Sequence, residues 1–165
     1  MPTPLSHRAS FLLSQLGHYV AQQFTERLAT RDLEPAHFGV LSHLATADGR
    51  SQQELAQLLD VHRNAMVGLI DQLEQRGLVR RQPHPDDRRA HAIHLTPAAH
   101  RAIDAGEREA DALEAEMLTH LDATERKTLV ELLSRVSSDA GLPPGIHPGL
   151  QRRRRSGARM QGRAR

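Results

Sequence analysis

The segment from Ser51 to Thr96 most constrains the fold, because two short amphipathic helical patterns are followed directly by two short strand patterns. Ser51-Gln52-Gln53-Glu54 has the S-x-x-E form of a capping box, which predicts the start of a helix. After a turn near Asp60, a second helix is predicted by apolar residues at i, i+3, i+4 and i+7, namely Met66, Leu69, Ile70 and Leu73. Gly77 is the expected residue for its end.

A β-hairpin is expected to follow the second helix. Leu78–Arg81 and Ala90–Leu95 have the pattern of two strands, and Asp86–Arg89 form a charged tip between them. A helix–turn–helix unit with such a hairpin is a winged helix. In that design the second helix enters the DNA major groove, and the hairpin reaches the backbone or the minor groove.

Long amphipathic patterns flank this unit and predict further helices, over about residues 6–30, 35–47, 97–120 and 123–141, with Gly106 a weak point in the third. They carry more apolar surface than one small domain can bury, so we expect a homodimer. The predicted fold is mainly α with a small β-hairpin wing: a winged helix-turn-helix plus a helical dimerisation region. Its parts are an N-terminal dimerisation helix (1–34), the DNA-binding domain (35–96), C-terminal dimerisation helices (97–141) and a disordered Arg-rich tail (142–165).

The positive charge of the chain is concentrated near its end. Arg152–Arg165 contains seven arginines and no acid, so the rest of the chain carries a net charge of −5 although the whole has +2. The tail is either a basic arm with non-specific affinity for phosphates or a solvated terminus. Within the domain, a local basic patch is expected around the hairpin, formed by Arg76, Arg80, Arg81, Arg88, Arg89 and Arg101.

Residues on the outer face of the second helix are the candidates for reading bases: His62, Arg63, Asn64, Ala65, Val67 and Gly68, with Asp71 and Gln72 further along. Arg63 can donate two hydrogen bonds to guanine, and Asn64 can pair with adenine. Ser51, Gln52 and Gln53 are expected to contact phosphates at the start of the preceding helix. Arg88 and Arg89 at the tip are expected either to enter a narrow minor groove or to pair with Asp86 and Asp87.

Three stretches resemble the MarR family of bacterial transcription regulators: Leu55-Ala56, Leu73–Arg81, and Asp86-Asp87-Arg88-Arg89 with the following Ile93–Thr96. The resemblance covers about residues 5–142. It implies a homodimeric repressor of a pseudo-palindromic operator, with a wing arginine, Arg88, in the minor groove. It also implies release by a small phenolic or anionic molecule bound near His18, Tyr19, Phe38 and His43.

The second helix departs from the usual family pattern, because His62 replaces a common serine while Val67 and Gly68 occupy positions often held by threonine and arginine. DNA readout is therefore expected to depend on Arg63, Asn64 and DNA shape. Two alternatives stay open: a sequence-indifferent architectural DNA-binding protein, and a protein-interaction module without DNA binding.

Other functional classes are not favoured by the sequence. The chain has no cysteine, and therefore no thiol chemistry. It has neither a glycine-rich phosphate loop nor a nucleophile elbow, so we do not expect an enzyme. Its eleven histidines lack the spacing of a metal site, and we predict neither a metal nor a cofactor. With no apolar run of membrane-spanning length, a cytoplasmic protein is expected.

Overall fold

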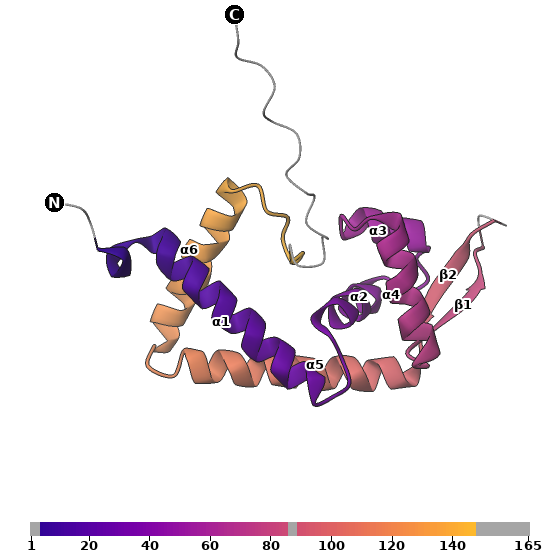
Figure 1. Cartoon of the computed structure of the whole chain (residues 1–165), viewed down its shortest axis with the longest axis horizontal. Helices are drawn as coiled ribbons and strands as arrows, with labels where there is room; N and C mark the ends of the chain where they lie inside the picture. Colours follow the sequence, from indigo (N-terminus) through magenta and orange to yellow (C-terminus); the bar gives the residue numbers. More distant parts are fainter. Residues whose placement is uncertain (1–3, 86–88, 148–165) are drawn as a thin grey trace, which may run out of the picture.

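The helices and the hairpin divide the molecule into a lobe that contains the hairpin and a helical arm (Figure 1). The computed structural model describes residues 4–85 and 89–147. A 3₁₀ turn at Leu5–His7 precedes α1, and the elements that follow it are α1 (Ala9–Ala29), α2 (Pro35–Thr46), α3 (Gln52–Leu58), α4 (Arg63–Gln75), β1 (Val79–Pro83), β2 (His91–Leu95), α5 (Pro97–Met117) and α6 (Ala123–Asp139). The mainly helical fold with one small hairpin is confirmed.

The lobe consists of α2, α3, α4 and the hairpin, packed around one apolar core. The stripe expected on the second helix of the pair faces inward, because Met66, Ile70 and Leu73 of α4 are fully buried and Leu69 is partly buried against them. Their partners include Leu41 of α2 and residues of α3 and β2. Each such side chain contributes about 1.5–3 kcal/mol relative to an exposed position, so the orientation of α4 is strongly fixed.

The hairpin is an antiparallel pair in which Val79 lies opposite Leu95 and Pro83 lies opposite His91. Residues before α3 extend it, since Gly49 N donates to Ile93 O at 2.9 Å and Ile93 N donates to Arg50 O at 2.9 Å. Gly77, between α4 and β1, has φ +68°, a conformation that glycine adopts without steric cost. The expected helix end at this residue is therefore confirmed.

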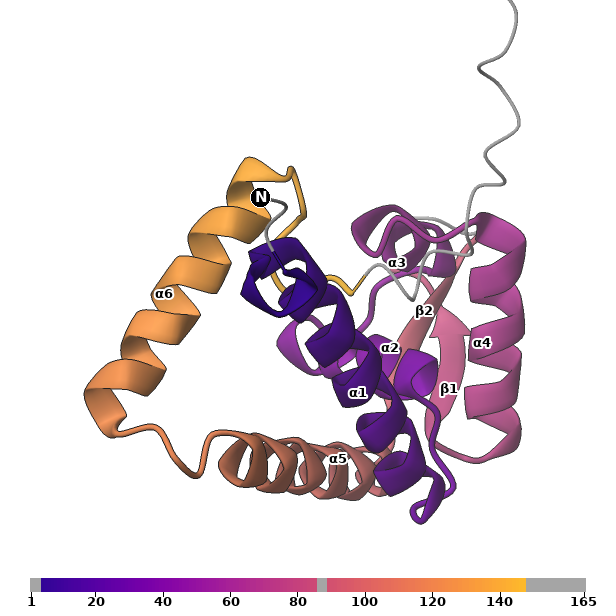
Figure 2. The ribbon, with the colours of Figure 1, turned by 60° about the vertical axis from the view of Figure 1, so that its left-hand side comes forward.

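The arm consists of α1, α5 and α6. α1 and α5 are linked by two ion pairs, Arg27–Glu116 and Arg31–Glu109. α6 stands apart from α1 (Figure 2), and none of its residues is buried. Large apolar side chains stay exposed on both helices: Phe11, Leu12, Leu13, Leu16 and Tyr19 on α1, and Val130, Leu132, Leu133 and Val136 on α6.

The chain returns from α6 to the lobe. Ile146 packs against the lobe's core, and a hydrogen bond of 3.2 Å joins Nε2 of His43 to the carbonyl oxygen of Gly145. Of the predicted tail, residues 148–165 lie outside the described residues. No helix in the described part of the chain is both long and apolar enough to cross a membrane.

Candidate nucleic-acid interface

α4 lies beside the hairpin, in the part of the molecule far from α6 (Figure 1). Arg63 and Asn64 in its first turn are exposed, as are Val67 and Gly68 in the next. Ala65 is half-buried and packs against the core. The structure thus brings four of the predicted base-reading residues together on one accessible face. Around Val67 and Gly68 this face of α4 carries only short side chains.

His62 is the N-cap of α4. Its Nδ1 accepts a hydrogen bond of 3.2 Å from the backbone N–H of Asn64. In the neutral ring this leaves the proton on Nε2. The imidazole thus accepts the hydrogen bond that a serine hydroxyl accepts at many helix N-termini. His62 therefore has a structural role, because it stabilises the first turn of α4.

Asp71 and Gln72, further along α4, have partners within the lobe, although Asp71 is only half-buried and Gln72 is exposed. Oδ1 of Asp71 accepts from the Arg81 guanidinium, and Oε1 of Gln72 lies 2.8 Å from Nε2 of the buried His37. Both side chains stay accessible to solvent while bound to protein partners, so their part in base reading remains a prediction. Sequence spacing placed them on the outer side of the helix, but partners distant in the sequence hold them.

The Arg81 clamp is the contact of the Arg81 side chain on β1 with Asp71 and Glu74, one turn apart on α4. The backbone N–H of Arg81 also donates to Oε1 of Glu74, at 3.2 Å. The Arg81 side chain is 20% exposed, whereas the side chains of Asp71 and Glu74 are 49% and 39% exposed, so water reaches the clamp from its carboxylate side. This clamp joins the recognition helix to the base of the wing.

A second contact joins the wing to the loop after α2. Asp48 accepts from the backbone N–H of Leu95 at 2.8 Å, and its other oxygen lies 2.7 Å from Nδ1 of His94. Burial of Asp48 disfavours the charged carboxylate, but the hydrogen bonds from His94 and Leu95 outweigh it and hold the pKa of Asp48 below its ordinary value. Asp48 is therefore ionised at neutral pH and fixes the end of β2.

The start of α3 forms the capping box that the sequence predicts. Oγ of Ser51 accepts from the N–H of Glu54 at 3.2 Å, and Glu54 accepts from the N–H of Ser51 at 2.7 Å. The backbone N–H of Ser51, as the largest cause, and the Ser51 hydroxyl stabilise the Glu54 carboxylate and hold the pKa of Glu54 below its ordinary value. Ser51 is buried and committed to the box, while Gln52 is half-buried and Gln53 exposed beside it.

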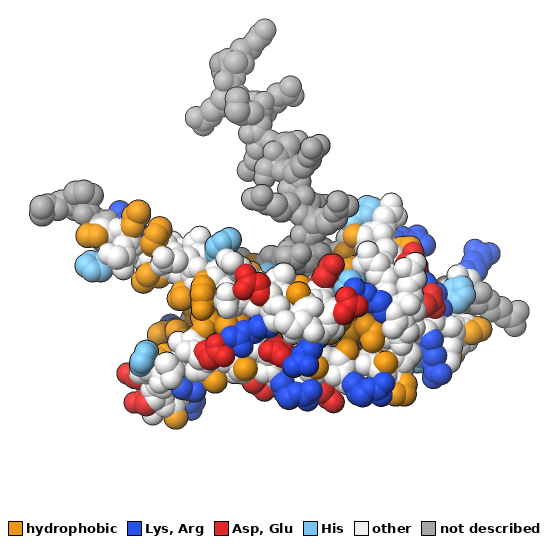
Figure 3. Space-filling model, turned by 60° about the horizontal axis from the view of Figure 1, so that its bottom comes forward, with side chains coloured by type: hydrophobic (Ala, Val, Ile, Leu, Met, Phe, Trp, Pro, Cys, Tyr) orange, Lys and Arg blue, Asp and Glu red, His pale blue; other side chains and the backbone are white. Residues whose placement is uncertain are grey.

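Two arginines of the expected basic patch are held by acidic partners. Arg76 donates to the backbone oxygen and the carboxylate of Asp32, and Arg81 belongs to its clamp, so both are neutralised locally. Arg80 and Arg89 are exposed on the wing, while Arg88, with its neighbours Asp86 and Asp87, lies outside the described residues. Figure 3 shows basic and acidic side chains interleaved along the α5 face.

The four residues expected near an effector lie in different surroundings. Tyr19 lines a shallow hollow between α1 and α5, together with Leu16, Glu116 and Met117. His18 is exposed beside it on α1. Phe38 packs edge-on against Phe24, with ring centroids 5.6 Å apart, and His43 contacts Gly145. Phe38 and His43 do not line this hollow.

The comparisons with known proteins agree with this geometry. Residues 31–90 match the model of the MarR family. A protein of Thauera aromatica, named as a transcriptional regulatory protein for the hcr operon, is 34% identical over 127 residues, which are 76% of each chain. The chain belongs to the MarR family.

Solved structures of MarR-type regulators resemble the whole arrangement of lobe and arm. CouR bound to a 23-mer DNA duplex superposes with a TM-score of 0.71 at 30% identity, covering 81% of this chain and 94% of CouR. CouR from Rhodococcus jostii RHA1 bound to p-coumaroyl-CoA superposes with a TM-score of 0.68 at 28% identity, covering 82% and 96%. The protein is accordingly a transcriptional regulator of the MarR type, and not an enzyme.

Proposed function

We propose that this MarR-type regulator is a repressor that binds a pseudo-palindromic operator as a homodimer. The observation that carries the proposal is the outer face of α4, which presents Arg63 and Asn64 to solvent while the Arg81 clamp holds its flank to the wing. Such a face fits the major groove, where arginine reads guanine and asparagine reads adenine. The DNA-bound form of CouR supports this docking.

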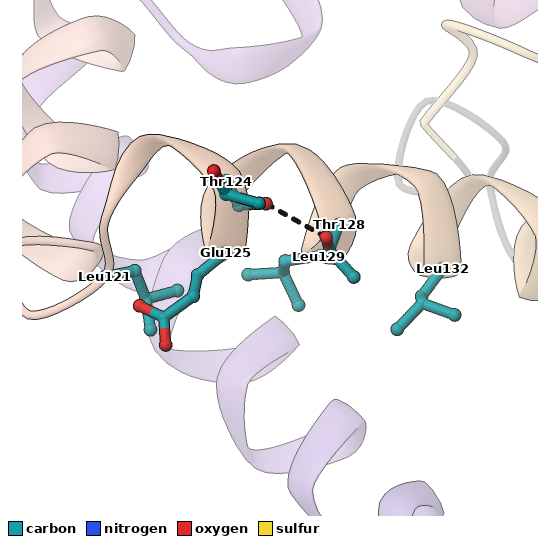
Figure 4. Close-up of a pocket in the computed structure, with 6 residues that line it drawn as sticks. All are labelled: Leu121, Thr124, Glu125, Thr128, Leu129 and Leu132. Atoms are coloured by element: carbon teal, nitrogen blue, oxygen red, sulfur yellow. Dashed lines mark hydrogen bonds between the residues drawn. The ribbon is translucent and has the colours of Figure 1, made fainter.

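The apolar faces of the arm support the homodimer. Exposed apolar side chains on α1 and α6 are too many for an isolated arm in water, and α6 buries none of its residues in its own chain. Figure 4 shows Leu121, Leu129 and Leu132 directed to the same side of α6, where they line a groove. A second copy of the chain would cover both faces and set the two α4 helices about 34 Å apart.

Repression and its release follow from this assembly. A dimer bound to a promoter excludes other proteins from that DNA. Because bacterial promoters lie in the cytoplasm, the proposed location of the protein is cytoplasmic. Because CouR binds p-coumaroyl-CoA, a phenolic and anionic molecule, we extend the proposal to a small phenolic or anionic effector that favours a spacing of the two lobes unsuited to DNA. Such a ligand acts only through different affinities for the two spacings.

A sequence-indifferent architectural role is the second candidate, and the short side chains of Val67 and Gly68 favour it. Footprinting on fragments that contain promoters separates the two functions. A repressor protects discrete sites at concentrations where flanking DNA stays accessible to cleavage. Uniform protection along the fragment would support the architectural role, and no protection at low salt would contradict both. Sedimentation of the full chain at the same concentrations tests the dimer separately.

A further inference from the structure

The arm and the lobe approach each other very closely at one contact, between Gly106 and Phe38. Gly106 of α5 is buried, and the ring of Phe38 of α2 lies directly over it. A Cβ atom added at Gly106 would lie 2.5 Å from Cδ2 of Phe38 and still nearer to Cε2. Carbon atoms pack at roughly 3.5–4.0 Å, so only glycine admits the ring at this distance.

The Phe38 ring is held from a second side. Phe24 of α1 meets it edge-on, at an interplanar angle of 75°. α1 is in turn joined to α5 by the Arg31–Glu109 and Arg27–Glu116 ion pairs. One side chain of the lobe is therefore enclosed by both long helices of the arm. The position of the ring therefore affects the packing of α2 against both helices.

The lobe and the arm also meet at Thr96, which links β2 to α5. Its Oγ donates to the carbonyl oxygens of Gly77 and Leu78, beside the end of α4. Gly106 lies ten residues further along α5, about 15 Å away at 1.5 Å per residue. The two contacts thus act as a pivot at Thr96 and a stop at Gly106, which together set the angle between α5 and the lobe.

We propose that the Phe38–Gly106 contact determines the operator half-site spacing that this regulator accepts. The proposal rests on the proposed homodimer and its two-part operator. A methyl group at Gly106 would displace the ring by about 1 Å, which over the 15 Å lever is a tilt of roughly 4°. α4 is about 20 Å long, so its first turn would move by about 1.4 Å in each protomer. The two shifts together, about 2.8 Å, amount to most of the 3.4 Å rise of one base pair.

The test uses the full-length protein and the operator obtained from random-sequence selection, with its spacer shortened or lengthened by one or two base pairs. Affinity is measured on each duplex for the unchanged chain, for Gly106→Ala, and for Gly106→Ala combined with Phe38→Ala. The control is Asp104→Ala, at an exposed position of the same helix. Thermal unfolding and sedimentation of each variant establish that it is folded and dimeric.

We expect Gly106→Ala to bind the original operator roughly tenfold more weakly, as for one mismatched base pair, and to prefer a spacer changed by one base pair. In the double variant the added methyl meets no ring, so the preference created by Gly106→Ala should be lost. The original preference should not return, because the contact that sets it is absent. An unchanged spacing preference in Gly106→Ala, with or without a uniform loss of affinity, would overturn the proposal.

A second variant keeps the test decisive if Gly106→Ala does not fold. Phe38→Leu replaces the ring that lies over Gly106 with a smaller side chain and should also change the preferred spacing. An unchanged preference would again overturn the proposal. If the unchanged chain selects no twofold motif at all, the proposed function itself fails, and this result is distinct from a failure of the spacing argument.

Discussion

The Arg81 clamp predicts a large effect for the substitution Arg81→Ala. The guanidinium is 20% exposed, while Asp71 and Glu74 are 49% and 39% exposed. An exposed ion pair contributes about 0.2–1 kcal/mol, whereas unpairing a buried charge costs about 3–5 kcal/mol. For these half-exposed carboxylates we expect the free energy of unfolding to fall by about 1–2 kcal/mol. DNA binding should weaken as well, since two unpaired carboxylates would then stand on the recognition helix.

Arg80→Ala is the matched control, because Arg80 is the preceding residue of β1 and is exposed. Its effect on unfolding should stay within about 0.5 kcal/mol, as for most surface substitutions. Urea unfolding at one fixed protein concentration measures both variants, since a dimer's stability depends on concentration. If Arg81→Ala loses no more stability than Arg80→Ala, the clamp does not hold the wing to α4.

Three further predictions concern DNA reading, pH and the tail. Arg63→Ala should reduce the discrimination between operator and random DNA by on the order of 1–3 kcal/mol; an equal loss on both would make Arg63 a phosphate contact. Because the pKa of Asp48 is lowered in the folded state, its contribution is present above the unfolded value near 4 and is lost as the pH falls through the folded value. Asp48→Asn should flatten this decline of the free energy of unfolding, measured with urea below about pH 5, and an identical slope would argue against it. Deleting residues 152–165 should make the salt dependence of DNA binding less steep; an unaltered slope would leave the tail without a role in binding.

Much of the lobe could be predicted from the sequence, because its signals are local. The apolar stripe of α4, the capping box at Ser51 and the glycine stop at Gly77 depend only on residues a few positions apart. The boundaries differ by a few residues: α5 ends at Met117 instead of His120. Local periodicity fixes which face of a helix is buried, and it did so here for the whole DNA-binding lobe.

The contacts that orient these elements could not be predicted in the same way. Arg81 was expected in a basic patch, but its partners lie on α4, across a chain reversal. Gly106 was expected to weaken its helix, yet it is a close-packed site whose neighbour Phe38 is 68 positions away in the sequence. Pairings of this kind depend on the tertiary fold, and a pattern within one helix carries no information about them.

Selection of bound sequences from random duplex DNA tests the central claim most directly. If two copies of the α4 face read DNA, the full-length protein should enrich a motif with twofold symmetry and half-sites about one helical turn apart. Substitution of Arg63 should then relax the preference at one symmetric pair of positions. Enrichment of no motif, or of a single half-site without its symmetric partner, would contradict the account.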